Sequence, residues 1–507
     1  MSFNQSMNIS LGSMKNNQYA LTVVSQNIAN LHVEGYRRQR VDFQTNEYTT
    51  NCENVLSTIR GMNGASISSL SDYVDEGAFR DLLDSNSDAQ YYNTLADALG
   101  GLEDITDDLG DNGLNALLND FFKASANLEQ FPADITIRTQ FLNAAEAVCD
   151  KFNDIDKKLS ATVDEQIQSV GSNVETINSL FETLAEYNKN LAGNKDVVQL
   201  KTELDSVVQE LSNYMDITTT TNPNGTYNLY LGEIAVVEGA EINYTLQVDY
   251  DRTNPDSTVA FSLKSTKNPD YVIEKGVNDF FNSGAIKAQI DFLNGSGSGF
   301  TNVNDLKSSM NSAASAFADA LNAIQMYDDG DVFAASIVTD PNTGDLLLEK
   351  AADNGPMVLG TSASDIRISQ DFLDNPFLVA AARIDKNKFE AGEDWTRAIG
   401  NSDNATKFTD LQNQKICSYG GGVNNCTLSQ FLTNSAAKAG LDAADVAKKA
   451  EVSQDIADMD ATNFANLIGV NLDEELADMI KYQRAYEASS KLFATINDLI
   501  GTIINMV

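Results

Sequence analysis

The C-terminal stretch of the chain, residues 470–507, carries apolar side chains at heptad spacing. One series recurs every seven residues and consists of Leu472, Met479, Tyr486, Phe493, Ile500 and Val507. A second series consists of Tyr482, Ile496 and Ile503, each three residues after a member of the first series. This pattern predicts a helix that buries one narrow apolar stripe against other helices, as in a coiled coil.

The N-terminal stretch, residues 1–34, shows the same spacing. Its apolar positions are Met7, Leu11, Met14, Leu21, Val24, Ile28 and Leu31. Residues 1–40 hold four basic residues and one acidic residue, whereas residues 470–507 hold six acidic and three basic residues. An antiparallel pairing of the two terminal helices would therefore bring opposite charges together.

A helix that is held by one narrow stripe is marginally stable in water. The stripes could pack on the body of their own chain, but their presence at both ends favours burial between copies in an assembly. We therefore expect them to be poorly ordered in the isolated chain. The candidate assembly interface consists of Met7, Leu11, Met14, Leu21, Val24, Ile28, Leu472, Met479, Tyr486, Phe493, Ile496, Ile500 and Ile503.

The interior of the chain alternates between two periodicities. Helical spacing predicts helices over 76–104, 114–128 and 195–214, and one run of about 55 residues that begins near Ile135. Interruptions are expected at Gly100-Gly101, Gly171 and Gly440. The spacing changes to alternation at Met215, and an Asn224-Gly225 pair marks a hairpin.

The predicted fold class is mainly α with β insertions. It is an elongated multidomain chain in which terminal coiled-coil helices join a long-helix bundle that carries an outward β domain. The expected parts are terminal helices at 1–34 and 470–507, an extended connector at 35–75, a helical bundle from 76–215, 283–328 and 372–469, a β insertion at 216–282 and a second small β insertion at 329–371.

Composition narrows the function classes. The chain of 507 residues has a formal net charge of −39, which argues against a nucleic-acid partner because phosphates would be repelled. No run of 18 apolar residues is present, and the N-terminus lacks the basic and apolar regions of a cleavable signal peptide.

Catalytic chemistry finds little support in the sequence. His32 is the only histidine, so a Ser-His-Asp or Cys-His site has no base, and no P-loop or zinc-binding HExxH motif occurs. We expect no enzyme activity, no cofactor and no metal site. Cys417 and Cys426 flank a glycine-rich turn and could form a disulfide, although two free thiols are equally compatible with the sequence.

Three stretches carry a resemblance to a known family. ALTVVSQNIANLHVEGYRRQRV at 20–41 resembles the N-terminal signature of the bacterial flagellar rod, hook and hook-associated proteins. GLNALLNDFFKASANLEQFPADITIRTQFLNAAEAV at 113–148 and GVNLDEELADMIKYQRAYEASSKLFATINDLIGTIIN at 469–505 are more specific and resemble the hook-associated proteins. Glu34 departs from the usual turn former before Gly35, and Ser10-Leu11-Gly12 departs from Ser-Gly-Leu, but neither changes the apolar stripe.

The resemblance implies a structural subunit at the junction between hook and filament. It implies export through the flagellar type III channel without a cleavable signal, and a secreted, extracellular location in the flagellum. The implied partners are copies of itself in a tubular ring, the hook protein, the next hook-associated junction protein, and an export chaperone at the C-terminal helix. The alternatives are another axial protein, of hook or filament type, or a secreted adhesin or enzyme that acts through its β insertions.

Overall fold

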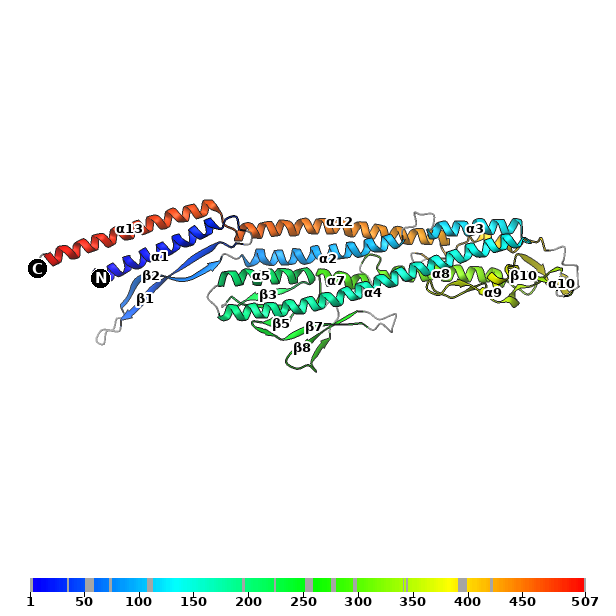
Figure 1. Cartoon of the computed structure of the whole chain (residues 1–507), viewed down its shortest axis with the longest axis horizontal. Coiled ribbons are helices and arrows are strands. Elements are labelled where there is room, and N and C mark those ends of the chain that lie inside the picture. The colour runs from blue at the N-terminus through cyan, green and yellow to red at the C-terminus, as the bar shows by residue number, and fades with distance from the viewer. Residues whose placement is uncertain are drawn as a thin grey trace.

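The structure is a computed structural model. It describes residues 3–33, 36–50, 59–72, 75–106, 113–193, 197–222, 225–250, 259–274, 280–294, 299–340, 342, 345–390, 399–419 and 423–505. These residues form an elongated molecule, with both termini at one end and a body of long helices with small sheets beyond them (Figure 1). The expected fold class, mainly helical with β insertions, is confirmed.

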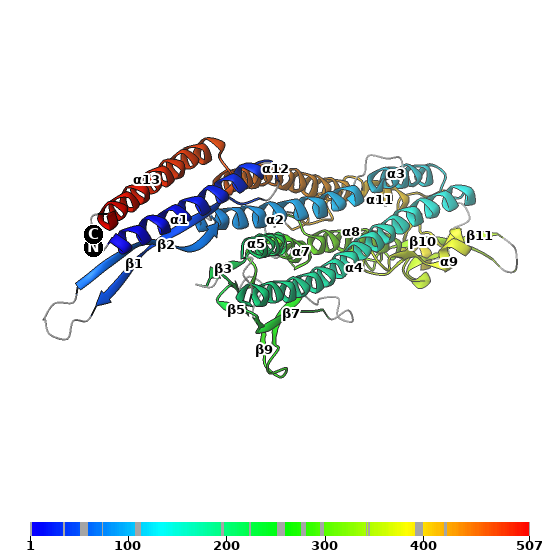
Figure 2. The same ribbon diagram turned by 60° about the vertical axis from the view of Figure 1, so that its left-hand side comes forward.

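The terminal module contains helices α1 (Phe3–Ala29) and α13 (Leu472–Asn505), which run side by side. Strands β1 (Gln39–Thr50) and β2 (Ile59–Asp72) form an antiparallel ribbon that packs against α1. Figure 2 shows this ribbon along the length of the helix pair. The predicted extended connector therefore contains a strand pair that lies beside the terminal helices.

The body is built around long helices that run along its axis. They are α2 (Glu76–Thr106), α3 (Leu114–Gln130), α4 (Ile135–Gly193), α5 (Val197–Tyr214), α7 (Gly284–Asn294), α8 (Val303–Gln325) and α12 (Leu428–Ile468). Helix α4 has 59 residues, which gives a rod of roughly 90 Å. Helices α2 and α12 make extensive contact and carry the body toward the terminal module (Figure 1).

The predicted interruptions at glycines are wrong. Helices α2, α4 and α12 continue through Gly100-Gly101, Gly171 and Gly440. A glycine inside a helix costs about 1 kcal/mol relative to alanine. Leu99 and Leu102, on either side of the first pair, are almost fully buried, and this burial offsets the cost.

Aromatic side chains fill the distal half of the body. Phe121 and Phe141 on α3 and α4 have ring centroids 5.3 Å apart, and Phe317 on α8 meets Phe121 at 5.4 Å. Phe408, on α11 (Ala405–Asp410), meets Phe141 at 5.1 Å. Four segments that are distant in sequence thus share one core, which holds the long helices in a single bundle.

The first β insertion forms two small sheets. One has the order β3-β4-β5-β6 and the other β7-β8-β9. Their strands are β3 (Thr218–Thr221), β4 (Tyr227–Leu231), β5 (Ile234–Glu238), β6 (Glu241–Ile242), β7 (Tyr244–Asp249), β8 (Ala260–Ser265) and β9 (Val272–Glu274). Gly225, at φ 86°, stands in the turn before β4; Asn224 lies outside the described residues.

These sheets are anchored to α4 through side-chain amides. The Asn188 amide donates to the carbonyl oxygens of Tyr227 at 2.9 Å and Gly239 at 2.8 Å. The Leu246 amide donates to the side-chain oxygen of Asn178 at 2.9 Å. The insertion therefore shares hydrogen bonds and apolar core with the helices, and the proposed domain boundaries at 216 and 282 remain a prediction.

The second insertion lies at the far end of the body (Figure 1). It contains β10 (Val332–Thr339), β11 (Leu346–Lys350), β12 (Val358–Leu359), β13 (Arg367–Ile368), β14 (Ala382–Asp385), α9 (Gln370–Asp374), α10 (Lys386–Glu390) and the 3-10 turns Ala351–Asn354 and Pro376–Leu378. Strand β14 pairs with β10, so residues 382–385, which the sequence places in the helical body, are extended. The expected turn at 341–344 falls largely outside the described residues.

A buried arginine ties the start of α4 to this end of the body. Arg138 is only 1% exposed, and its guanidinium donates to the carbonyl oxygens of Pro132 and Val379, both at 2.6 Å. It also donates to the carbonyl oxygens of Pro376 and Phe377 at 3.3 Å. Burial lowers the pKa of Arg138 to about 10, so the side chain remains charged at neutral pH.

Candidate assembly interface

The two terminal helices pair in antiparallel orientation. The Ser13 and Ser489 hydroxyls are 2.9 Å apart, and the Asn27 amide donates to the Glu475 carboxylate at 3.0 Å. These contacts are separated by 14 residues on each helix, so the pairing keeps one register over about four turns. The antiparallel pairing expected from the charges is therefore present.

The core between these helices is small. Among the described residues, the buried apolar cluster here consists of Ala20 and Val23 from α1 and Val41 from β1, with Ile67 and Tyr482 packed beside it. A core of this size contributes few kilocalories per mole to folding. The terminal module therefore depends on polar contacts and on whatever covers its remaining apolar surface.

The structure divides the thirteen predicted interface residues into three groups. Val24 and Ile496 are buried inside the chain. Three are exposed, namely Leu11, Leu472 and Ile503. The remaining eight are half-buried, and these are Met7, Met14, Leu21, Ile28, Met479, Tyr486, Phe493 and Ile500. Most of the predicted stripe is therefore at least half covered within the chain itself, and its role between copies stays a prediction.

A second set of apolar residues on α13 was missed by the heptad analysis. They lie beside the paired seam and are 43 to 68% exposed, namely Leu476, Ile480, Leu492, Leu499 and Ile504. Together with Leu472 and Ile503, they leave the apolar flanks of α13 open to solvent. Exposed apolar surface of this extent on one helix is typical of an interaction face.

The predicted meeting of opposite charges occurs at the base of the terminal module. The Arg38 guanidinium lies 2.6 Å from the buried carboxylate of Glu475, contacts Glu474, and lies 3.5 Å from Asp478. Burial alone would lower the pKa of Arg38, but its hydrogen bonds and charge interactions with Glu475 and Glu474 raise it overall. The Arg38 amide also donates to the Ile468 carbonyl oxygen at 2.9 Å, at the end of α12.

The neighbouring arginine points into the body instead. Arg37 is 3% exposed and forms an ion pair with the buried Asp205 of α5. Asp205 also accepts a hydrogen bond from the Tyr227 hydroxyl of β4, and Arg37 lies 6.0 Å from the Phe464 ring centroid on α12. Burial raises the pKa of Asp205, although Arg37 and Tyr227 act in the opposite direction.

Cys417 and Cys426 lie opposite each other on antiparallel backbone. Each amide donates to the carbonyl oxygen of the other residue, at 3.2 and 3.3 Å. Such a pair has Cα atoms about 5.5 Å apart, within the range that a disulfide spans. Both thiols are free in this structure, as is that of the buried Cys149, while Cys52 lies outside the described residues.

We expect Cys417 and Cys426 to form a disulfide under oxidising conditions, since the backbone already places them together. Closing this short loop should raise the free energy of unfolding by about 2 kcal/mol. Thiol counting on unreduced, denatured protein checks this expectation. A count of two supports the crosslink, and a count of four excludes it.

Within the described ranges, no cluster of three or more His, Cys, Asp and Glu side chains is arranged to hold a metal ion. In the same part of the chain, no helix is long and apolar enough to cross a membrane.

Comparison with known proteins shows which family the chain resembles. Residues 99–329 match the family model described as the flagellar hook-associated protein FlgK helical domain. The resemblance to the flagellar hook-associated proteins is confirmed. Residues 464–506 match the C-terminal model of the flagellar basal body rod proteins FlgEFG, which covers α13.

Two relatives that align along almost their whole length are both named flagellar hook-associated protein 1. Flagellar hook-associated protein 1 of Bacillus subtilis is 24% identical over 96% of this chain and 95% of its own length. The protein of that name from Salmonella typhimurium is 22% identical over 99% of both chains. The solved structure of the flagellar hook junction protein FlgK from Burkholderia pseudomallei has a TM-score of 0.59 at 12% identity, and the match covers 76% of this chain and 99% of that one. This last likeness concerns the fold alone.

Proposed function

We propose that this chain is a structural subunit of the bacterial flagellum at the junction between hook and filament. The observation that carries the proposal is the match to hook-associated protein 1 along 96% of the chain. An antiparallel helix pair with a small core and exposed apolar flanks suits a subunit that completes its burial in a tube of copies.

The remaining parts of the proposal follow from the family. The chain is exported through the flagellar channel without a cleavable signal and functions outside the cell. Its neighbours are copies of itself, the hook protein and the next hook-associated protein, and an export chaperone covers α13 before export. The subunit acts mechanically and has no enzymatic activity.

The test is a strain from which the gene for this chain has been deleted. Hooks should form at normal length and flagellin should appear in the medium, but filaments should be absent from the hooks. Expression of the full chain from a plasmid should restore filaments. Normal filaments in the deletion strain would refute a junction role.

A further inference from the structure

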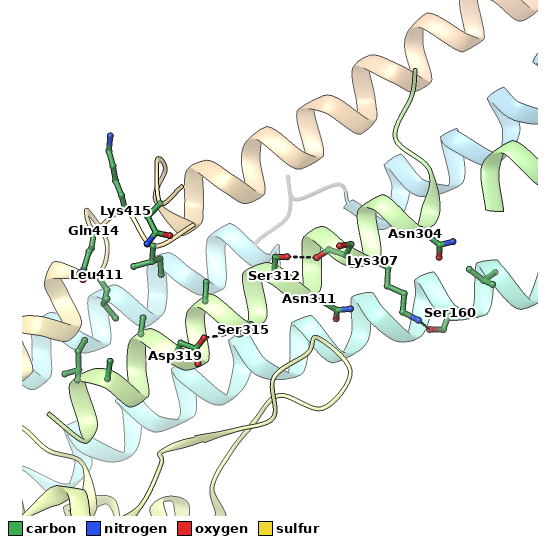
Figure 3. A pocket seen from close by; sticks show the side chains of 18 of the residues that line it. Ser160, Asn304, Lys307, Asn311, Ser312, Ser315, Asp319, Leu411, Gln414 and Lys415 are labelled. Carbon is green, nitrogen blue, oxygen red and sulfur yellow. Dashed lines mark hydrogen bonds between the residues drawn. The ribbon is translucent and has the colours of Figure 1, made fainter. Parts of the chain in front are cut away.

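A cysteine pair closes the segment that leads into α12. Cys417 and Cys426 face each other on antiparallel backbone, and Cys426 directly precedes Thr427, the N-cap residue of α12. The same segment forms one wall of a groove beside α8, where Figure 3 shows Leu411 and Lys415. A bond between the two cysteines would therefore fix this wall to the start of the helix that runs to the terminal module.

Hydrogen bonds hold the two cysteines together before any covalent bond forms. The Tyr419 amide donates to the side-chain oxygen of Asn425 at 2.9 Å, and the Asn425 side-chain amide donates to the Tyr419 carbonyl oxygen at 2.7 Å. The Cys426 sulfur lies 3.5 Å from the Cys417 carbonyl oxygen. Folding thus brings the thiols close to each other, and this proximity favours a bond between them over a lasting bond to a small thiol.

Folding also hides both thiols from solvent. The exposed fraction is 4% for Cys417 and 7% for Cys426. Burial raises the pKa of Cys417 to about 12, and it also raises the pKa of Cys426. Thiol–disulfide exchange needs a thiolate and an accessible sulfur. The folded, reduced chain should therefore react slowly with an external disulfide, and the closed bond should be shielded from external thiols.

We propose that Cys417 and Cys426 form a latch that closes while the chain folds in the presence of an oxidant and resists closure once the chain has folded. The oxidant is a small disulfide such as glutathione disulfide. One cysteine thiolate attacks it, forms a mixed disulfide and releases a glutathione thiolate. The other cysteine thiolate attacks the protein sulfur of the mixed disulfide, forms the intramolecular bond and releases the second glutathione thiolate.

The reaction is balanced by the oxidant. The cysteine pair loses two electrons and two protons, glutathione disulfide gains the two electrons, and the protons pass through solvent to the released glutathiones. A chain that folds in reducing surroundings keeps both thiols, and their burial then preserves that state. The latch rests on the proposed function only for its place of action, since export would let the chain fold outside the reducing cytosol.

The test uses the full chain with Cys52→Ser and Cys149→Ala, so that the pair supplies its only thiols. One sample is folded with both thiols reduced and is then mixed with glutathione disulfide at neutral pH. A second sample is unfolded in urea and diluted into the same oxidant. Acid-quenched and alkylated samples are then mapped by peptide mass. The bond between positions 417 and 426 should form at least about tenfold faster during refolding than in the folded chain.

Equal rates in the two samples, or no bond in either, would overturn the proposal. Cys417→Ser in the same background is the control, because Cys426 then has no partner and can form only a mixed disulfide. The chain with all four cysteines, mapped in the same way, should show the same difference in rate. This second measurement keeps the test valid if the two background substitutions disturb folding.

Chains recovered from cells separate this inference from the junction role. Chains on isolated hooks should carry the bond, and chains in the cytosol should carry two thiols. Hook-bound chains that keep both thiols would refute closure outside the cell and leave the junction role intact. If the chain is absent from hooks, the junction role fails, and the refolding rates alone decide whether the latch exists.

Discussion

Replacing Leu492 and Leu499 with aspartate is expected to abolish attachment of the chain to hooks while leaving its body folded. Both side chains are about half exposed on α13 and lie outside the seam that faces α1. In a tube of copies these leucines would be buried against neighbouring helices, and burying two unpaired carboxylates there costs several kilocalories per mole. Export of the variant followed by binding to purified hooks measures the effect.

The matched control is Thr495→Asp with Thr502→Asp, which adds the same charge to exposed polar positions of α13. Each threonine hydroxyl donates to a carbonyl oxygen of its own helix, at 2.9 Å. The control should bind hooks within about twofold of the unchanged chain. If the leucine variant binds as well as the control does, the exposed flanks of α13 are not the assembly interface.

A comparison with the half-buried seam separates two causes of failure. Phe493→Asp with Ile500→Asp should also abolish attachment, but by separating α13 from α1. In the structure both terminal stripes are helical and paired within a single chain, unlike the expectation that they are poorly ordered there. Circular dichroism of the full chain should therefore show a loss of helix for this variant and none for the leucine variant.

Replacing Arg138 with methionine is expected to lower the free energy of unfolding of the body by about 3–5 kcal/mol. The guanidinium supplies hydrogen bonds to four carbonyl oxygens from two segments that are far apart in sequence. Methionine fills a similar volume but removes all the hydrogen bonds that the guanidinium supplies to these carbonyls. Urea unfolding, followed by circular dichroism at 222 nm, measures the change.

Arg367→Met is the control for this experiment. Arg367 is exposed, and its guanidinium donates to the Asp365 carbonyl oxygen at 3.2 Å. Its replacement should change the unfolding free energy by less than about 0.5 kcal/mol. Equal effects of the two substitutions would show that the buried guanidinium does not hold the segments together.

The sequence predicts the terminal helices well because their pattern is local and repeats. Heptad spacing identifies the seam, and the net charges of the two ends predict the antiparallel pairing that Arg38 and Glu475 display. The heptad spacing does not identify Leu492 or Leu499, because it marks only the positions that face a partner helix and these two leucines lie beside them. These flanking residues become evident only when α1 is seen to cover the seam and leave them open.

Errors arise where distant contacts decide the local conformation. The alanine-rich segment before β14 has the composition of a helix, yet Ala382 pairs with Ala335, almost 50 residues earlier. Gly440 would end an isolated helix, but α12 continues because it makes extensive contact with α2. Periodicity within one segment contains no information about such partners.

The adjacent arginines at the base of the terminal module determine how load passes through the subunit. Arg37 is fixed to Asp205 in the body and Arg38 to Glu475 in the terminal helices, from consecutive positions of one chain segment. A torque applied to the helix pair therefore reaches the body through two ionic side chains as well as through the backbone segments that connect the two parts. This joint resists twisting because neither part can rotate without breaking a buried charge contact.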